Sequence, residues 1–384
     1  MTLQEIERLK SEEVRKAIED NIERDPAVVA LDGRVPEARL VATQVKYLQR
    51  ARHKLPRLYA ARCIIPPRAF EQSSSEMCAR RKDIAGGRLL DLTCGLGIDT
   101  IAFAEHFTRV VALERDEALA EVVRHNLTLL GVDNVEVVTT SAEEFVAHTT
   151  ETFDWVFADP DRRSDKGNKM VCLEDCSPNI ATLLPQLQRI TRHIGLKLSP
   201  LFDVEEAFRL FPNAEVEVVS LGGECKEVNI YTGEHSKRLT IASIGLGTCY
   251  FDSDAMHATP SVETFDKDCY RYLVIPDVAL QKGRVAIAAL KPYADIWSNN
   301  GYAFARTMPT EPIAARVYEI ESIEHYRPRE LKRRYKGVGI EILKRDTPLN
   351  IEAVRKAIGA RAGGERTVAL TNIAGESWII ELKD

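Results

Sequence analysis

Short apolar runs alternate with amphipathic stretches through the middle of the chain, and this alternation constrains the fold more than any other feature. The runs are apolar almost throughout, as expected of strands buried on both faces of a sheet. Strands are expected at Arg88–Leu92, Val110–Glu114, Val135–Thr139, Trp155–Ala158 and Gly195–Leu198. Helices are expected between them at Thr100–His106, Glu117–Leu130, Ala142–His148 and Ile180–Ile190. This order predicts an α/β fold with a doubly wound, Rossmann-like parallel sheet.

Different patterns flank this alternation. Residues 1–65 have apolar side chains at helical spacing, with Asp25-Pro26 as a stop, and Pro66-Pro67 predicts an extended linker. β-like runs between residues 215 and 245 predict an antiparallel addition to the sheet. We expect four parts: an N-terminal helical region (1–65), the sheet domain (66–265), a small α+β, ferredoxin-like region (266–322) and a C-terminal α+β domain (323–384).

The C-terminal part has a strand–helix–strand–strand pattern. Asn350 is placed to cap a helix over Ile351–Ile358. Thr367–Asn372 and Ser377–Leu382 are expected to pair as a hairpin.

Composition excludes several classes of protein. No apolar run approaches the roughly 20 residues that span a bilayer, and the charged start lacks the apolar core of a signal peptide, so we expect a cytoplasmic protein without membrane contact. The eight cysteines are scattered without C-x-x-C spacing, which predicts reduced thiols and no metal site. The net charge of −6 argues against a uniformly basic nucleic-acid binder but leaves room for local basic surfaces.

The segment Leu89–Thr100 joins the first predicted strand to the first helix of the sheet domain. Glycines stand at 95 and 97, and glycine is needed where the backbone turns sharply or a ligand approaches closely. The helix that follows presents free N–H groups at its N-terminus. The segment therefore predicts a nucleotide-type cofactor pocket, whose expected ligand-binding residues here are Thr93, Gly95, Gly97 and Asp99.

Two ligand classes use such a turn. Dinucleotide sites favour G-x-G-x-x-G, but Thr100 occupies the third glycine position. Asp91 stands four residues before Gly95, where an acid repels phosphate and suits the ammonium of a methionine-like ligand. These features disfavour a nicotinamide oxidoreductase and favour S-adenosylmethionine (SAM), with Asp91 among its ligands.

The ends of the second and third strands support this interpretation. Glu114, followed by Arg115, ends the second strand where ribose hydroxyls need an acceptor. Ser141 and Ala142 follow the third strand, in a position that commonly borders the adenine. Methyltransferases often have Asp in place of Ser141, which weakens the expected contact to the adenine amino group. The alternative is that Glu114 and Ser141 only cap strand ends.

The fourth strand ends in Phe157-Ala158-Asp159-Pro160-Asp161-Arg162-Arg163. Substrate meets the transferable methyl group at this position of such sheets. Enzymes that methylate base amines carry D/N-P-P-Y/F/W here, and this chain keeps Asp159-Pro160 but has Asp161-Arg162 next. We expect Asp159, Pro160, Asp161 and Arg162 to form the catalytic segment, with Asp159 also near the cofactor. The alternative is an Asp–Arg ion pair that closes a loop.

Several motifs together resemble one bacterial family, the class I SAM-dependent methyltransferases with a C-terminal THUMP-like domain. They are FEQSSSE at 70–76, DLTCGLGIDT at 91–100, FADPDRR at 157–163, LEDCSP at 173–178, LKLSP at 196–200, GGECKE at 222–227 and RRYKGVGIEILKRD at 333–346. The core also resembles, more distantly, RNA methyltransferases of the trimethylguanosine-synthase type, which carry S-P-P-W in place of residues 159–162.

The resemblance implies further site residues and a substrate. Gln72 and Ser74 would approach the methionine end of SAM, although Ser73–Ser75 also suits a helix cap. Lys197, Ser199 and Pro200 would flank the pocket near Asp159. Because THUMP-type domains usually accompany tRNA-modifying enzymes, residues 323–384 would be a THUMP-like, RNA-binding domain.

Two basic clusters agree with an RNA partner. The expected RNA-binding residues are Lys46, Arg50, Arg52, Lys54, Arg57, Arg163, Arg333, Arg334 and Lys336. A solvated helix face is the alternative for each cluster.

The sequence thus predicts a methyltransferase that acts on a base nitrogen of structured RNA, with tRNA as the expected class. Two alternatives stay open. One is a small-molecule methyltransferase, which would not need basic appended domains. The other is an RNA-binding protein that binds SAM without turnover.

Overall fold

The computed structural model describes residues 1–162, 173, 176–233, 237–260, 262, 264–310 and 313–383. The chain forms two compact units. Unit 1 contains residues 1–202 and 229–235, and unit 2 contains residues 203–228 and 236–384. This division is coarser than the four parts expected from the sequence, and their boundaries stay predictions.

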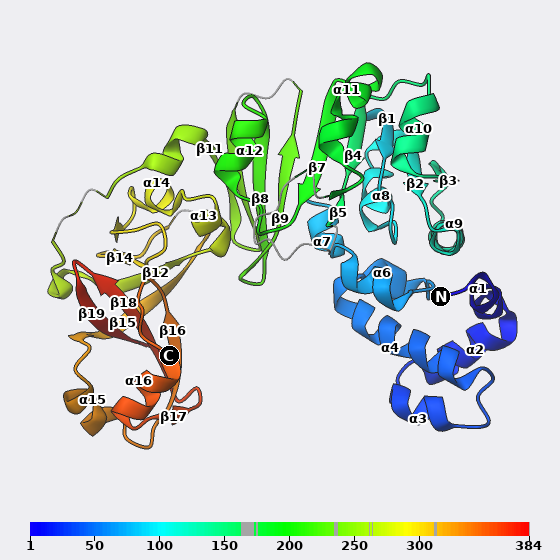
Figure 1. Ribbon diagram of the computed structural model, residues 1–384. Coiled ribbons are helices and arrows are strands. Elements are labelled where there is room, and N and C mark those ends of the chain that lie inside the picture. The colour runs from blue at the N-terminus through cyan, green and yellow to red at the C-terminus, as the bar shows by residue number, and fades with distance from the viewer. Residues whose placement is uncertain are drawn as a thin grey trace. The chain divides into compact units, whose positions relative to one another are not determined.

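Unit 1 is built on parallel strands in the order β7-β4-β1-β2-β3 (Figure 1). Their bounds are β1 (Gly86–Asp91), β2 (Phe107–Glu114), β3 (Val135–Thr139), β4 (Trp155–Ala158) and β7 (His193–Leu198). Each neighbouring pair is parallel. The strand order reverses at β1, which lies between β2 and β4, and ligands of such sheets bind outside the carboxyl ends of the strands at this reversal. The predicted α/β fold is confirmed.

Helices alternate with these strands. Their bounds are α8 (Ile98–Phe103), α9 (Glu117–Leu130), α10 (Ala142–His148) and α11 (Ile180–Ile190). The last three coincide with the predicted ranges, because Asp116, Ser141 and Asn179 each cap a first turn. Helix α8 begins two residues earlier than predicted, directly after Gly97.

The N-terminal part of unit 1 is helical, as expected. Its helices are α1 (Leu3–Lys10), α2 (Glu12–Asn21), α3 (Pro26–Leu31), α4 (Ala38–Lys54), α5 (Pro56–Ala60), α6 (Pro67–Gln72) and α7 (Glu76–Ala79). The predicted break at Asp25-Pro26 is confirmed, because α2 ends at Asn21 and a new helix begins at Pro26. The extended linker predicted at Pro66-Pro67 holds for Pro66 but not for Pro67. Pro26 and Pro67 each open a helix at its first position, where a missing N–H costs nothing and the fixed φ suits the helix.

These N-terminal helices share a hydrophobic core with α8 and α9. Ile6, Val45 and Leu48 are buried in the same cluster as Ile98 and Val122. The Asn126 side chain makes two hydrogen bonds to the Ile64 backbone, accepting from its N–H and donating to its carbonyl, both at 2.9 Å. The helical region is therefore an integral part of unit 1, and it fixes α6 beside the carboxyl ends of the strands.

Unit 2 begins with α12 (Val204–Leu210) and β8 (Glu215–Leu221). Strand β10 (Arg238–Ile244) pairs in parallel with β8 and antiparallel with β11 (Gly247–Asp252). The predicted antiparallel addition is therefore wrong for the β8–β10 pair. Gly222 and Gly223, both with positive φ, turn the chain between β8 and β9 (Glu224–Tyr231), and β10 then runs in the same direction as β8.

The rest of unit 2 contains an eight-stranded sheet in the order β13-β14-β12-β15-β19-β18-β16-β17. Its strands are β12 (Tyr272–Pro276), β13 (Asp295–Ile296), β14 (Ala303–Ala305), β15 (Ala315–His325), β16 (Gly339–Lys344), β17 (Arg361–Ala362), β18 (Arg366–Ile373) and β19 (Glu376–Leu382). The hairpin predicted near the C-terminus is confirmed as the antiparallel pair β18–β19.

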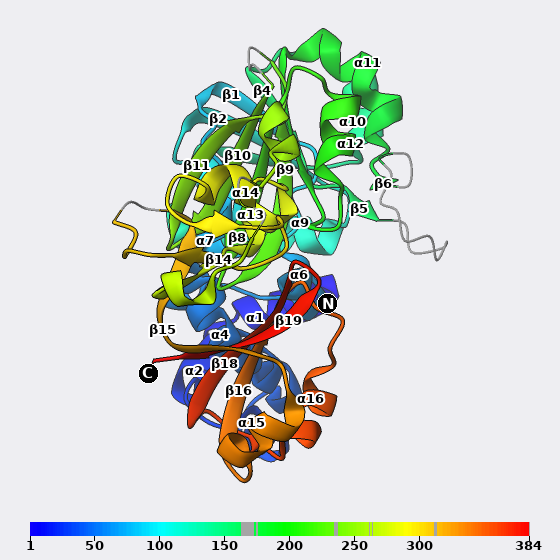
Figure 2. The same cartoon turned by 90° about the vertical axis from the view of Figure 1, so that its left-hand side faces the viewer.

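Helices α15 (Pro328–Tyr335) and α16 (Ile351–Ile358) lie side by side on one face of this sheet (Figures 1 and 2). Leu331, Tyr335 and Val354 bury their side chains against Val368 and Leu370 of β18. Asn350 caps α16 as predicted. The other helices of unit 2 are α13 (Val278–Lys282) and α14 (Ala286–Leu290), with short 3₁₀ turns at Ser253–His257 and Lys267–Cys269.

Candidate active site

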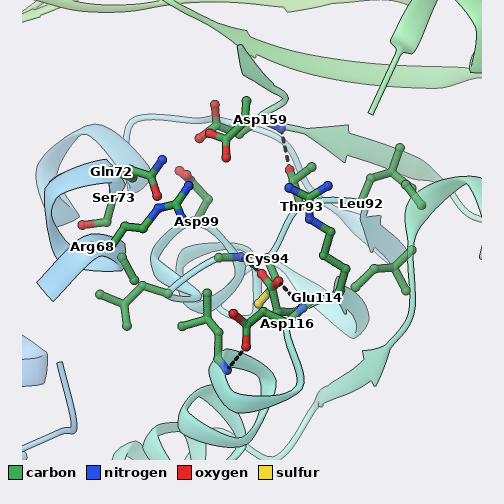
Figure 3. Close-up of a pocket in the computed structure, with 18 of the residues that line it drawn as sticks. Arg68, Gln72, Ser73, Leu92, Thr93, Cys94, Asp99, Glu114, Asp116 and Asp159 are labelled. Carbon is green, nitrogen blue, oxygen red and sulfur yellow. Dashed lines mark hydrogen bonds between the residues drawn. The ribbon is translucent and has the colours of Figure 1, made fainter. Parts of the chain in front are cut away.

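A cavity of about 410 Å³ opens at the carboxyl ends of the parallel strands of unit 1 (Figure 3). Its volume lies in the range of small-molecule and cofactor sites. Of the expected cofactor residues, those that line it are Gln72, Ser74, Thr93, Gly95, Asp99, Glu114, Arg115, Ser141, Ala142 and Asp159. The described lining does not include Asp91 or Gly97. Residues from five separate segments of the sequence therefore meet at one place.

The two glycines of the turn after β1 have different surroundings. Both have left-handed backbones, with φ of 55° at Gly95 and 82° at Gly97. A Cβ at Gly97 would lie 3.2 Å from a methyl group of Val123, whereas a Cβ at Gly95 would meet nothing closer than 4.0 Å. Gly97 therefore allows α8 to pack against α9, and Gly95 leaves the cavity wall open.

Asp91, the last residue of β1, lies behind this turn and is hydrogen-bonded to it. Its carboxylate is 1% exposed and accepts hydrogen bonds from the Thr93 N–H at 3.0 Å and the Thr100 hydroxyl at 2.6 Å. Burial raises the pKa of Asp91 to about 7, although both hydrogen bonds oppose the shift. The structure therefore places Asp91 behind the cavity wall, where its hydrogen bonds join Thr93 at the start of the glycine turn to Thr100 of α8.

Glu114 lies at the end of β2 and faces the cavity. One carboxylate oxygen accepts from the Gly95 N–H at 3.0 Å and the other from the Asp116 N–H at 2.9 Å. Burial raises the pKa of Glu114, against the effect of these two backbone donors. A carboxylate fixed by two backbone donors keeps free lone pairs for hydroxyl groups of a ligand.

The end of β3 contributes a smaller part of the wall. Ser141 caps α10 by accepting from the Glu144 N–H at 3.1 Å. Both Ser141 and Ala142 line the cavity, and so do Asp116 and Glu143, which the sequence did not single out. Ser141 therefore both caps α10 and forms part of the cavity wall. The capping alternative for Ser141 does not exclude a ligand role.

Asp159 follows β4 on the far side of the cavity from Glu114 (Figure 3). Its backbone N–H donates to the Thr93 hydroxyl at 2.6 Å, and its carboxylate forms an ion pair with Lys197 of β7. Asp161, in the short strand β5 (Asp161–Arg162), also lines the cavity. Pro160 is buried and is not part of the described lining. The Arg162 side chain and Arg163 lie outside the described part of the chain.

A chain of alternating charges runs along this side of the cavity. The Lys82 ammonium lies 2.8 Å from Asp99, and Lys197 lies 3.7 Å from Asp99 while it pairs with Asp159. The Ser74 hydroxyl donates to Asp99 at 3.0 Å, whereas Ser75 caps α7. Burial alone would raise the pKa of Asp99, but the two lysines outweigh it and lower that pKa to about 2. Asp99 is therefore an ionised carboxylate in the wall.

The sequence analysis missed Lys82 and Arg68. Lys82 lies in a run of charged residues, 80–83, that resembles a surface loop, and nothing in its spacing marks a buried ammonium. Arg68 stands next to the two prolines taken for a linker, so it was not placed in a helix. Among the described residues, no His/Cys/Asp/Glu group suits a metal ion, and no helix in the same residues is long and apolar enough to cross a membrane.

The first expected RNA-binding cluster, on α4 and α5, is largely paired with acids. Arg50 pairs with Glu71, Arg52 with Glu23 and Arg57 with Glu105. Lys54 donates to the Phe70 carbonyl at 2.6 Å. The sequence shows no acid between residues 46 and 62, but the fold brings acids from other segments to these cations and offsets their charge.

Ion pairs with acids offset less of the positive charge in the second cluster, on α15. Arg334 pairs with Glu324 and Glu381. Lys332, Arg333 and Lys336 are exposed and form no ion pair with any described residue. These three side chains therefore give the face of α15 an unbalanced positive charge.

Family models match two parts of the chain. Residues 315–383 match the model described as THUMP domain-like. Residues 47–156 match the model of tRNA (uracil-5-)-methyltransferases. The second match covers the strands β1 to β3, the glycine turn and Glu114, and it ends within β4.

Relatives extend the similarity over most of the chain. An uncharacterized S-adenosylmethionine-dependent methyltransferase of Mycobacterium tuberculosis (strain CDC 1551) is 24% identical over 331 residues, which cover 84% of this chain and 88% of the relative. A tRNA/tmRNA (uracil-C(5))-methyltransferase of Actinobacillus pleuropneumoniae is 29% identical, over 31% of this chain and 38% of its own length. The chain is a homologue of SAM-dependent methyltransferases.

A solved structure supports the fold of the whole chain. A Porphyromonas gingivalis W83 protein, provisionally named a methyltransferase, superposes with a TM-score of 0.82 at 24% identity and covers 97% of each chain. The predicted methyltransferase fold and the predicted THUMP-like C-terminal region are therefore confirmed, and the cofactor implied by the homologues is SAM.

Proposed function

We propose that this protein transfers the methyl group of SAM to a base nitrogen of structured RNA, with tRNA as the expected class. The observation that carries the proposal is the arrangement around the cavity. Glu114 stands at one end of the cavity, and Asp159 stands at the carboxyl end of β4, where the substrate meets the cofactor in such sheets. RNA as partner rests on the THUMP-like match and on relatives named for tRNA. The cytoplasm is the compartment that this substrate implies.

The cavity residues fit SAM. Glu114 is fixed by two backbone N–H groups and offers its free lone pairs to ribose hydroxyls. Asp99 is ionised and faces the cavity beside Ser74, which suits the ammonium of the methionine end. When bound, SAM supplies an electrophilic methyl group on a positively charged sulfur. The surplus of carboxylates in the wall complements that positive charge.

Asp159 is the proposed catalytic residue. Its backbone is tied to Thr93 of the glycine turn, and the charge of Lys197 stabilises its ionised form. An ionised carboxylate at this position accepts a hydrogen bond from the N–H of a base and orients the nitrogen lone pair. Asp159 then takes the proton that the nitrogen loses.

The tRNA/tmRNA relative is named for methylation of a carbon atom, C5 of uracil, and the described residues of this chain lack a group for that chemistry. Methylation of C5 needs a nucleophile, commonly a thiolate, to add first to the ring. Cys94 lines the cavity, but burial raises the pKa of its thiol well above the ordinary range. The described residues therefore favour a nitrogen target.

The test is a methyl-transfer assay with labelled SAM and RNA from a strain that lacks this gene, followed by nucleoside mass spectrometry. We expect an N-methylated base that wild-type protein restores and that Asp159→Asn reduces at least 100-fold, with the affinity for S-adenosylhomocysteine unchanged. Glu117→Gln, an exposed acid at the start of α9 outside the described lining, serves as the matched control. Label in 5-methyluridine would overturn the nitrogen target, and label only in small molecules would overturn the RNA substrate.

A further inference from the structure

The charges in the cavity wall are strongly unbalanced. Its described lining contains the acids Asp99, Glu114, Asp116, Glu143, Asp159 and Asp161, but only two cationic side chains, Arg68 and Arg115, besides the N-terminal ammonium of Met1. SAM carries two positive groups, the sulfonium and the ammonium, and one negative group, the carboxylate of its methionine end. The acids account for the positive groups, and the carboxylate needs a cation of the wall as its partner, because an unpaired buried charge is costly.

Arg68 is the second residue of α6, the helix that also carries Gln72. Figure 3 shows its side chain directed into the cavity on the same side as Gln72 and Ser73. Arg68 forms no ion pair with any described residue, whereas Arg50, which packs over Phe70 of the same helix, pairs with Glu71. A guanidinium that faces a cavity without a carboxylate partner is ready to receive one from a ligand.

The position of Arg68 corresponds to the methionine end of the cavity. Ser74, two residues after Gln72, donates to Asp99, and Asp99 is the acid that the proposed function places beside the ammonium. Glu114 and Ser141, which border the ribose and adenine positions, belong to the ends of β2 and β3 instead. We propose that Arg68 binds the carboxylate of the methionine end of SAM through paired N–H···O hydrogen bonds, a role that rests on the proposed use of SAM.

The local structure prepares Arg68 for this task. Pro66 precedes α6 and Pro67 opens it, so the first turn has a fixed backbone. Phe70 of the same turn is buried in the core that α4 shares with the sheet domain. The helix is therefore anchored, and only the Arg68 side chain has to become ordered when the ligand binds.

Arg115 is the matched control. It follows Glu114 directly, lines the same cavity and is exposed like Arg68. Its guanidinium donates a long hydrogen bond of 3.4 Å to Ser177, in the short strand β6 (Cys176–Ser177). Because Arg115 lies next to Glu114, the proposed acceptor for the ribose hydroxyls, it is assigned to the opposite end of SAM from Arg68.

The experiment measures binding by calorimetry, without RNA, for two ligands that differ only in the carboxylate. They are S-adenosylhomocysteine and its decarboxylated analogue, which keeps the ammonium. We expect the wild-type protein to prefer S-adenosylhomocysteine by about 10- to 100-fold, as a charge-assisted bidentate pair implies. Arg68→Gln should abolish this preference by weakening only the binding of S-adenosylhomocysteine, and Arg115→Gln should keep it.

Each other outcome has a distinct meaning. A preference that survives in Arg68→Gln, or a loss of affinity for both ligands to the same degree, would overturn the role of Arg68. Unchanged binding of both ligands in Arg68→Gln would also overturn it, and weaker RNA binding by the same variant in a separate filter-binding assay would then make Arg68 an RNA contact. Wild-type protein that binds neither ligand would contradict the proposed function itself. Thermal unfolding of both variants, expected within 2 °C of wild type, checks that the fold is intact.

Discussion

Lys82, whose side chain has no exposed surface, holds its ammonium 2.8 Å from the carboxylate of Asp99 in the cavity wall. The pair joins the segment before β1 to the first turn of α8, so it connects the N-terminal helices to the glycine turn. Lys197 lies 3.7 Å from the same carboxylate and continues to Asp159. One line of charges thus connects Asp99 and Asp159, two carboxylates of the cavity wall.

Replacement of Lys82 by methionine should destabilise the protein strongly. The variant leaves Asp99 buried with Lys197 as the remaining cation, and removal of one partner of a buried pair costs about 3–5 kcal/mol. Urea denaturation of the full-length protein measures the loss in unfolding free energy. The double variant Lys82→Met/Asp99→Asn should recover part of it, because the second change removes the uncompensated charge. A loss below about 1 kcal/mol, the level of a surface pair, would contradict this role of Lys82.

The two glycines of the turn should respond differently to alanine. Gly97→Ala places a Cβ against Val123 at positive φ, so we expect a loss of about 2 kcal/mol or more in unfolding free energy. Gly95→Ala has room for its Cβ and should cost about 1 kcal/mol, from the left-handed backbone alone. Its main effect should be weaker binding of S-adenosylhomocysteine, because the new methyl group stands at the cavity wall. Equal changes in stability for both variants would argue against this division.

The sheet domain could be predicted from the sequence because its signals are local. The strands are apolar throughout, and the helices between them begin at side-chain caps such as Asp116 and Ser141. The prolines marked breaks between helices correctly, but Pro67 was assigned to an extended linker. It opens α6 instead, because the fixed φ of proline suits the first turn of a helix.

The site was predictable only in part, since contacts between distant segments leave no local signal. Glu114 and Asp159 follow strands and were found from their position in the order of the sheet. Arg68 reaches the cavity from the segment before β1, and Lys82 of the same segment pairs with Asp99 from behind the cavity wall. The acids that pair with α4 also come from other segments, so the apparent basic cluster at 46–62 was overestimated.

The stability of unit 1 should fall between pH 5 and pH 8 because of Asp91. Its pKa is raised from 3.8 to about 7 in the folded protein, so the folded state holds a proton that the unfolded state has lost. That contribution is lost progressively as the pH rises from about 4 to about 7, by about 4 kcal/mol in total at 1.36 kcal/mol per pKa unit, of which about 3 kcal/mol is lost above pH 5. Asp91→Asn should flatten this dependence in thermal unfolding followed from pH 5 to pH 8. An unchanged slope in the variant would assign the effect to other groups.

The face of α15 should contribute more to RNA binding than the cluster on α4, although both carry many cations. Lys332, Arg333 and Lys336 form no ion pair with described residues, so each can neutralise a phosphate without breaking an existing contact. Replacement of all three by glutamine should weaken RNA binding at least tenfold. It should also reduce the slope of log K against log salt by about 2, since each lost phosphate contact contributes about 0.7–0.9.

Replacement of three paired arginines by glutamine is the control with an equal change in charge. Arg50, Arg52 and Arg57 already neutralise Glu71, Glu23 and Glu105, and their removal exposes these acids. We expect a change of less than 1 in the salt slope, with some loss of thermal stability from the broken pairs. Filter binding with tRNA at several salt concentrations measures both slopes. If the α4 variant loses as much slope as the α15 variant, pairing within the protein does not decide which cations contact RNA, and the α15 surface loses its assigned role.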